Sequence, residues 1–177
     1  MRFADFLKAT VLTSAGAATA LAALTLAGAS SDDQLTLVYL MVAWWLIAAL
    51  IGSVLGRRNE TTPPIARLLA SARFQHALPD VAPARVLLNR LWPLLGSTIA
   101  AGLLSVYAPQ IPGIAAGFAI IWALAWRRQD AAVTAIEERD GARFYVERTS
   151  PFRAIKLVRT PGLKAALPRV DRTAAHS

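Results

Sequence analysis

Long uncharged apolar runs alternate along this chain with shorter segments that carry its charge. The clearest run is Leu35 to Leu55, which has 21 residues and no charged side chain. A helix of that length crosses a hydrocarbon layer of about 30 Å. Three further apolar runs are 9–29, 88–107 and 109–126, and Arg90 lies near the start of the second of these. The pattern predicts four membrane-spanning helices.

The polar segments between the runs predict how the spans are connected. Residues 30–34 and 108–112 are too short to do more than join antiparallel neighbours. The predicted fold class is therefore an all-α membrane protein. Residues 1–128 form a four-transmembrane-helix bundle with a basic cytoplasmic loop at 56–87, and a small basic cytoplasmic segment follows at the C-terminus.

The loop at 56–87 contains one predicted helix, which Pro63 and Pro64 are suited to start. Its apolar residues share one face and its two arginines lie away from that face: Ile65, Leu68, Leu69 and Ala72 against Arg67 and Arg73. Such a helix either lies on the inner membrane surface or packs under the bundle. The sequence leaves these two alternatives open.

Residues 129–160 are interpreted as a cytoplasmic extension of the fourth helix followed by a short β-hairpin. Its strands are expected at 142–148 and 153–159, on either side of Thr149–Phe152. Basic residues alternate there with apolar ones, which predicts one cationic and one apolar face: Arg143, Arg148, Arg153, Lys156 and Arg159 against Phe144, Val146, Ile155 and Leu157. Residues 161–177 are predicted to be a disordered basic tail.

The start of the chain has two interpretations. Residues 1–8 form a short polar start, and the run at 9–29 is long but only weakly apolar. Ala27, Gly28 and Ala29 before Ser30 resemble the cleavage site of a signal peptide. The run is longer than a signal core, however, and its small residues at four-residue spacing are typical of packed membrane helices. We favour a retained span over a cleaved signal peptide.

Charge predicts the orientation of the spans. The chain is 55% hydrophobic, with a mean hydropathy of +0.44 and a net charge of +8. All 19 Lys and Arg residues fall in three segments, with 2 in residues 1–8, 6 in 56–90 and 11 in 127–177. The positive-inside rule then gives a multi-pass protein of the plasma (inner) membrane with both termini cytoplasmic.

The residues that usually carry chemistry are sparse. The chain has no cysteine, which excludes disulfides, thiolate catalysis and cysteine-type zinc sites. His76 has no second histidine nearby, and Glu137, Glu138 and Asp140 are interleaved with arginines as in a solvated helix end. We therefore expect no catalytic residues, no metal site and no cofactor, and the protein is interpreted as non-enzymatic.

Two groups of intramembrane residues are candidates for packing or for binding. Trp44 and Trp45 lie at the middle of the second span, although membrane tryptophans favour the interfaces. They either pack against small residues or form an apolar ligand site. Four glycines are candidates for close helix packing because small residues let backbones approach: Gly96, Gly102, Gly113 and Gly117.

These features favour a scaffold or accessory subunit whose basic cytoplasmic face engages anionic lipid or a partner protein. The alternative is a small oligomeric transporter or flippase-type carrier for an amphipathic or lipid-linked substrate. Expected partners are anionic head groups on the cytoplasmic side and a protein partner or second copy, with nucleic acid disfavoured. The candidate lipid or partner contacts are Arg57, Arg58, Arg67, Arg73, Arg127, Arg128, Arg143, Arg148, Arg153, Lys156 and Arg159.

Overall fold

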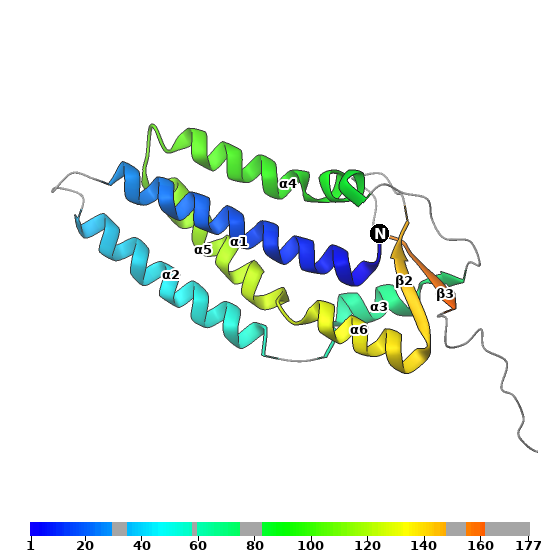
Figure 1. Ribbon diagram of the computed structural model, residues 1–177. Coiled ribbons are helices and arrows are strands. Elements are labelled where there is room, and N and C mark those ends of the chain that lie inside the picture. The colour runs from blue at the N-terminus through cyan, green and yellow to red at the C-terminus, as the bar shows by residue number, and fades with distance from the viewer. Residues whose placement is uncertain (30–34, 58–59, 75–82, 148–154, 162–177) are drawn as a thin grey trace, which may run out of the picture.

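The described part of the chain is mostly helical. The computed structural model describes residues 1–29, 35–57, 60–74, 83–147 and 155–161. Four long helices lie side by side, namely α1 (Phe3–Gly28), α2 (Leu35–Leu55), α4 (Pro83–Leu104) and α5 (Gln110–Trp126) (Figure 1). Two shorter helices, α3 (Pro63–Ala70) and α6 (Gln129–Asp140), gather with a small sheet at one end.

Three of the long helices, α1, α2 and α4, are long and apolar enough to cross a membrane. α2 has the bounds that its uncharged run predicts, and at 1.5 Å per residue it is about 32 Å long. Large apolar side chains such as Leu40, Leu46 and Leu50 are exposed on it, as a lipid-facing surface requires. The four-span bundle is not confirmed, because α5 has only 17 residues.

α5 lies at the centre of the long helices and packs most extensively against α1 and α2. Gly113 and Gly117 of α5 face residues early in α2, and Ile121 faces Gly52 late in α2. The two helices therefore run in the same direction. α1 runs in the opposite direction, since Gly28 at its end approaches Pro109 just before α5 begins.

The short elements form one unit, which we call the cap: residues 1–7, 60–74, 129–147 and 155–161. Its sheet has the strand order β1 (Arg73–Phe74), β3 (Leu157–Pro161), β2 (Ala142–Val146). β2 and β3 are antiparallel, as the predicted hairpin requires, whereas β1 pairs with β3 in parallel. The sequence did not predict β1, and β3 extends to Pro161, the first residue of the predicted tail.

The first residues of the chain belong to the core of the cap, so the prediction of a short polar start is wrong. α1 begins at Phe3, and Phe3 and Leu7 are each only 1% exposed. They pack with residues of α3, α6 and the sheet. The backbone also joins the chain start to β2. The Val146 N–H donates to the Met1 carbonyl at 3.1 Å, and Arg2 forms an isolated antiparallel β-bridge with Tyr145 of β2.

α3 packs its apolar face into the same core. Ile65 is buried, and Leu68, Leu69 and Ala72 are half-buried against it, while Arg67 is exposed. Of the two alternatives for this helix, packing within the protein is the one observed. The hairpin, which would be marginal alone, gains its stability from this shared core of α1, α3 and α6.

Retention of the first span is the first testable prediction. The packing of Phe3, Phe6 and Leu7 into the cap means that cleavage after Ala29 would remove a large part of the cap core. We expect the intact mass of the protein, purified from membranes without an N-terminal tag, to include residues 1–29. A mature N-terminus at Ser30 would contradict this prediction.

Candidate functional site

Trp44 and Trp45 both contact α5, although they are neighbours on α2. The Trp45 indole N–H donates to the Gly113 carbonyl at 2.8 Å, and the Trp44 indole N–H donates to the Ile114 carbonyl at 3.2 Å. The Trp44 ring also meets Phe118 edge-on, with 5.6 Å between ring centroids. The polar edge of each indole is therefore used in holding two helices together. This arrangement favours packing over an apolar ligand wall.

Glycines on both helices make this contact possible. A Cβ on Gly117 would overlap the Trp44 indole, and one on Gly113 would lie 3.0 Å from Met41 Cγ. Toward the end of both helices the glycines lie on the α2 side. A Cβ on Gly52 would lie 2.9 Å from Leu124 Cβ of α5, and one on Gly56 would overlap the Leu124 carbonyl. Bulky side chains of each helix thus lie against glycines of the other.

The sequence analysis identified the glycine pair on α5 but missed the pair on α2. Gly52 and Gly56 have the same four-residue spacing, and this spacing was the signal that could have found them. The two glycines proposed on α4 differ from these. A Cβ on Gly102 would lie at an ordinary contact distance of 3.4 Å from Leu24 of α1, whereas one on Gly96 would meet nothing within 4 Å among the described residues.

A part-buried ion pair joins the N-terminus to α6. Arg2 Nη2 lies 2.6 Å from Glu137 Oε2, and the Glu137 side chain is only 4% exposed. The second carboxylate oxygen, Oε1, accepts the Phe144 N–H at 2.9 Å, at the start of β2. The hydrogen bond to Glu137 raises the pKa of Arg2 above its ordinary value. One carboxylate therefore connects the chain start, α6 and the sheet.

Sequence reasoning missed this pair because Glu137 was interpreted as part of a solvated acidic helix end. That interpretation is wrong for Glu137 but holds for Glu138 and Asp140, which are exposed. Gly141 ends α6 in the left-handed conformation, with φ of 59°, and its N–H donates to the Glu137 carbonyl. Among the described residues, no group of three or more His, Asp or Glu side chains could hold a metal ion. His76 lies outside them.

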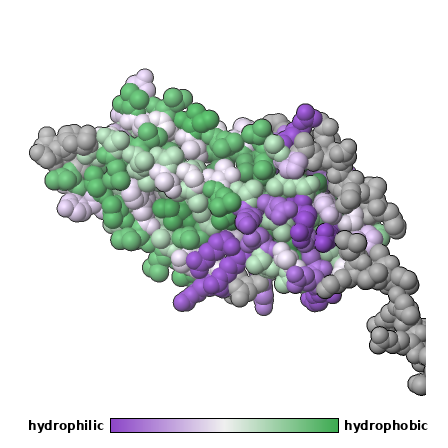
Figure 2. Space-filling model, in the orientation of Figure 1, coloured by the Kyte–Doolittle hydropathy of each residue, from purple (hydrophilic) through white to green (hydrophobic). Residues whose placement is uncertain are grey.

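The basic candidates separate into two groups. Arg57, Arg127 and Arg128 follow the ends of α2 and α5, and Arg128 Nη1 donates to the Arg57 carbonyl at 3.1 Å. Figure 2 shows hydrophobic residues over the long helices and hydrophilic ones toward the cap. The second group lies on the cap and is exposed apart from the last member: Arg67, Arg73, Arg143, Lys156 and Arg159. Arg58, Arg148 and Arg153 lie outside the described residues.

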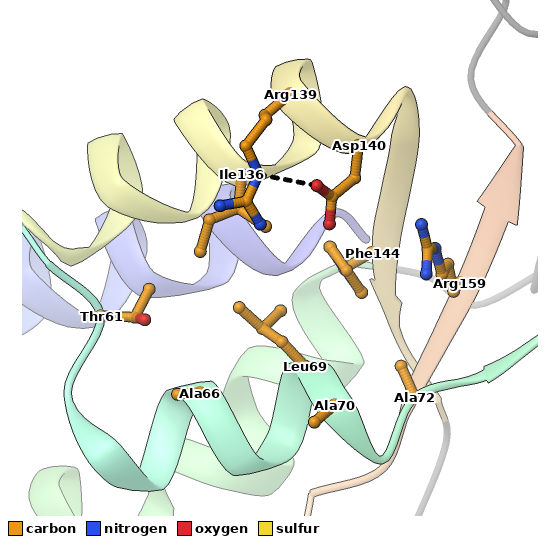
Figure 3. A pocket seen from close by; sticks show the side chains of 10 residues that line it. All are labelled: Thr61, Ala66, Leu69, Ala70, Ala72, Ile136, Arg139, Asp140, Phe144 and Arg159. Atoms are coloured by element: carbon orange, nitrogen blue, oxygen red, sulfur yellow. Dashed lines mark hydrogen bonds and ion pairs between the residues drawn. The ribbon is translucent and has the colours of Figure 1, made fainter.

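The prediction of a single cationic face on the hairpin is wrong. Residues directly opposite in an antiparallel pair share one face of the sheet, and the register pairs Arg159 with Phe144 and Arg143 with Thr160. Arg143 and Arg159 therefore lie on opposite faces. Arg159 is half-buried on the face that holds Phe144, beside α3 and α6 (Figure 3).

Two segments of the cap are joined directly after the end of α5, where α6 begins. Gln129, the first residue of α6, is only 2% exposed. Its amide accepts the Thr62 N–H at 3.1 Å and donates to the Glu60 carbonyl at 3.3 Å. These bonds hold the start of α3 beside the start of α6.

Comparison with protein-family models, curated proteins and solved structures finds no match to this chain.

Proposed function

We propose that this protein is a non-enzymatic scaffold or accessory subunit of the plasma (inner) membrane. In this proposal α5 is the fourth span, both termini are cytoplasmic, and the basic cytoplasmic face engages anionic lipid or a partner protein. Two observations support the fourth span. First, α5 is uncharged and lies in the middle of the long helices. Second, it runs parallel to α2, which is the direction expected of a fourth span returning after α4.

The single observation that carries the lipid contact is the position of the first basic group. Arg57 and Arg127 are exposed directly after the ends of α2 and α5, where those helices would leave the bilayer. A Lys or Arg near an anionic membrane surface contributes about 1 kcal/mol. The cap lies next to this group of arginines, because α6 begins at Gln129, directly after Arg127 and Arg128.

The transporter alternative gains less support. Ion-coupled carriers use ionisable residues within their spans, and the described residues 35–55 and 110–126 contain none. Both central tryptophans donate to carbonyls of α5, so neither N–H is free for a substrate. Scaffolding is the function that these contacts favour.

The lipid contact can be tested by native mass spectrometry of the protein in detergent with mixed phosphatidylglycerol and phosphatidylcholine. We expect phosphatidylglycerol to be retained preferentially. The double variant R57Q/R127Q should bind it about 30-fold more weakly, because about 2 kcal/mol of attraction is lost. The matched control R67Q/R143Q removes the same charge from exposed positions on the cap and should change retention little. A wild-type protein without preference for phosphatidylglycerol would contradict the lipid contact.

A further inference from the structure

A cavity lies in the cap between α3 and α6 and is closed at one end by the sheet. Its volume is about 330 Å³, within the range of small-molecule sites. Leu69 comes from α3, Ile136 from α6 and Phe144 from β2, and together they give the cavity apolar walls (Figure 3). Three charged residues, Arg139, Asp140 and Arg159, also line the cavity. The remaining lining residues are small: Thr61, Ala66, Ala70 and Ala72.

The cavity continues toward the long helices. A second hollow of about 430 Å³ shares Thr61, Ile136 and Arg139 with the first and extends to Glu60 and Ala132. Gln129, the first residue of α6, holds Glu60 in place by donating to its backbone carbonyl. The combined groove therefore leads from the junction of α5 and α6 to the sheet.

Arg159, which lines this groove, has an unsatisfied donor. Its Nε atom is buried and has no hydrogen-bond partner among the residues that the structure describes. A buried donor without a partner costs about 1–3 kcal/mol, and such groups in folded proteins usually bond to water, an ion or a ligand. A ligand with a hydrogen-bond acceptor would therefore be stabilised next to Arg159 at the cavity wall.

Arg139 supplies a second guanidinium that can be released. Its Nε donates to Asp140 Oδ1 at 2.8 Å, and its side chain is 73% exposed. The same bond holds the pKa of the Asp140 carboxyl below its usual value. Exposed ion pairs contribute little net free energy, so an entering anion can compete with Asp140 for Arg139.

The four charged groups that face the groove set the charge of the ligand. Arg139 and Arg159 are balanced by Asp140 and Glu60, so a singly charged anion fits better than a polyphosphate. Guanidinium groups match phosphate oxygens in geometry and charge. The apolar walls require that the ligand also carry a nonpolar part.

We propose that this groove binds an amphipathic phosphodiester, with Arg159 and Arg139 donating to the phosphate and Leu69, Ile136 and Phe144 contacting the apolar part. The phosphodiester is either the head group of a phospholipid entering from the bilayer or a soluble ester. The first source rests on the proposed function, because it requires the groove to open at the cytoplasmic membrane surface.

The two sources can be separated by titrating the full-length protein in detergent by calorimetry. Dihexanoyl phosphatidylglycerol is the lipid probe, dibutyl phosphate is the soluble amphipathic probe, and dioctanoylglycerol, which has no phosphate, is the control. We expect saturable binding of the lipid probe and none of dioctanoylglycerol. Equal binding of dibutyl phosphate would support the soluble source, and absence of saturable binding for both phosphodiesters would overturn the proposal.

Variants locate the binding within the groove. R159Q should weaken binding about tenfold, as expected for loss of a charge-assisted hydrogen bond. Ala70→Phe adds a bulky side chain at a position that lines the cavity, without changing charge. It should weaken binding similarly, which keeps the test valid if R159Q fails to fold. R143Q removes the same charge from the opposite face of the sheet and is the matched control. Wild-type affinity in both R159Q and A70F, or equal weakening in R143Q, would overturn the proposal.

This result is independent of the lipid contact proposed above. Loss of phosphatidylglycerol retention in R57Q/R127Q with unchanged calorimetric binding in R159Q and A70F would leave the scaffold function and overturn only the groove. Weakened calorimetric binding in R159Q and A70F, with unchanged retention in R57Q/R127Q, would support binding in the groove. It would contradict the lipid contact proposed for Arg57 and Arg127.

Discussion

Replacing Gly56 by alanine is expected to lower the free energy of unfolding by about 2 kcal/mol, the usual cost of overpacking a tight contact. A Cβ at this position would overlap the Leu124 carbonyl oxygen of α5. Backbone cannot rotate out of the way as a side chain can, so α2 and α5 must separate. The separation would also loosen the neighbouring contact at Gly52, and dispersion contacts are a main force between helices in lipid.

Thermal unfolding in detergent, followed by tryptophan fluorescence, measures this loss. A cost of 2 kcal/mol corresponds to a midpoint lower by roughly 5 °C for a chain of this size. Gly96→Ala is the matched control, because a Cβ there meets no heavy atom within 4 Å. Alanine favours the helix over glycine by about 1 kcal/mol, so the control should be unchanged or more stable. Equal midpoints for both variants would contradict the tight contact.

Replacing Glu137 by alanine is expected to destabilise the cap by about 3 kcal/mol. Removing one partner of a buried ion pair costs about 3–5 kcal/mol, and the lower end applies here because the Arg2 side chain is 36% exposed and can regain water. The change also leaves the Phe144 N–H without its acceptor. The chain start and the sheet would lose their common attachment to α6.

Hydrogen exchange reports this loss locally. We expect faster exchange at the Phe144 and Val146 amides, since Val146 donates to the Met1 carbonyl beside the ion pair. Glu138→Ala is the matched control, the same substitution on the same helix at an exposed position, and surface changes of this kind stay within about 0.5 kcal/mol. Glu137→Gln keeps an acceptor for Phe144 and should be intermediate. Wild-type exchange in E137A would show that the ion pair does not hold the cap.

The helical spans were the part of the fold that local pattern could predict. α2 has its predicted bounds, because an uncharged apolar run of 21 residues has few alternatives to a helix in a membrane. The strands at 142–146 and 157–161 were predicted in type but not in full extent. Their alternation with basic residues was misleading, because the register places Arg159 on the same face as Phe144.

The candidate site was predictable only in part. Glycine spacing and the central position of the tryptophans identified Gly113, Gly117, Trp44 and Trp45 as packing candidates, but did not predict that α2 and α5 contact each other through them. The partner glycines on α2 were missed, although they have the same spacing. The spacing of Phe3, Phe6 and Leu7 also marked a buried helical face, which the charges of Arg2 and Lys8 concealed.

By itself, the sequence determined that this is a mostly helical protein with spans long enough for a membrane, because length and apolar composition are local properties of each run. Only the tertiary structure decided that the chain start is buried, that Arg2 meets Glu137 across 135 positions, and that a charged groove lies between α3 and α6. These features depend on which distant segments share one core. The free energy of packing between such segments cannot be derived from the pattern of any single local stretch.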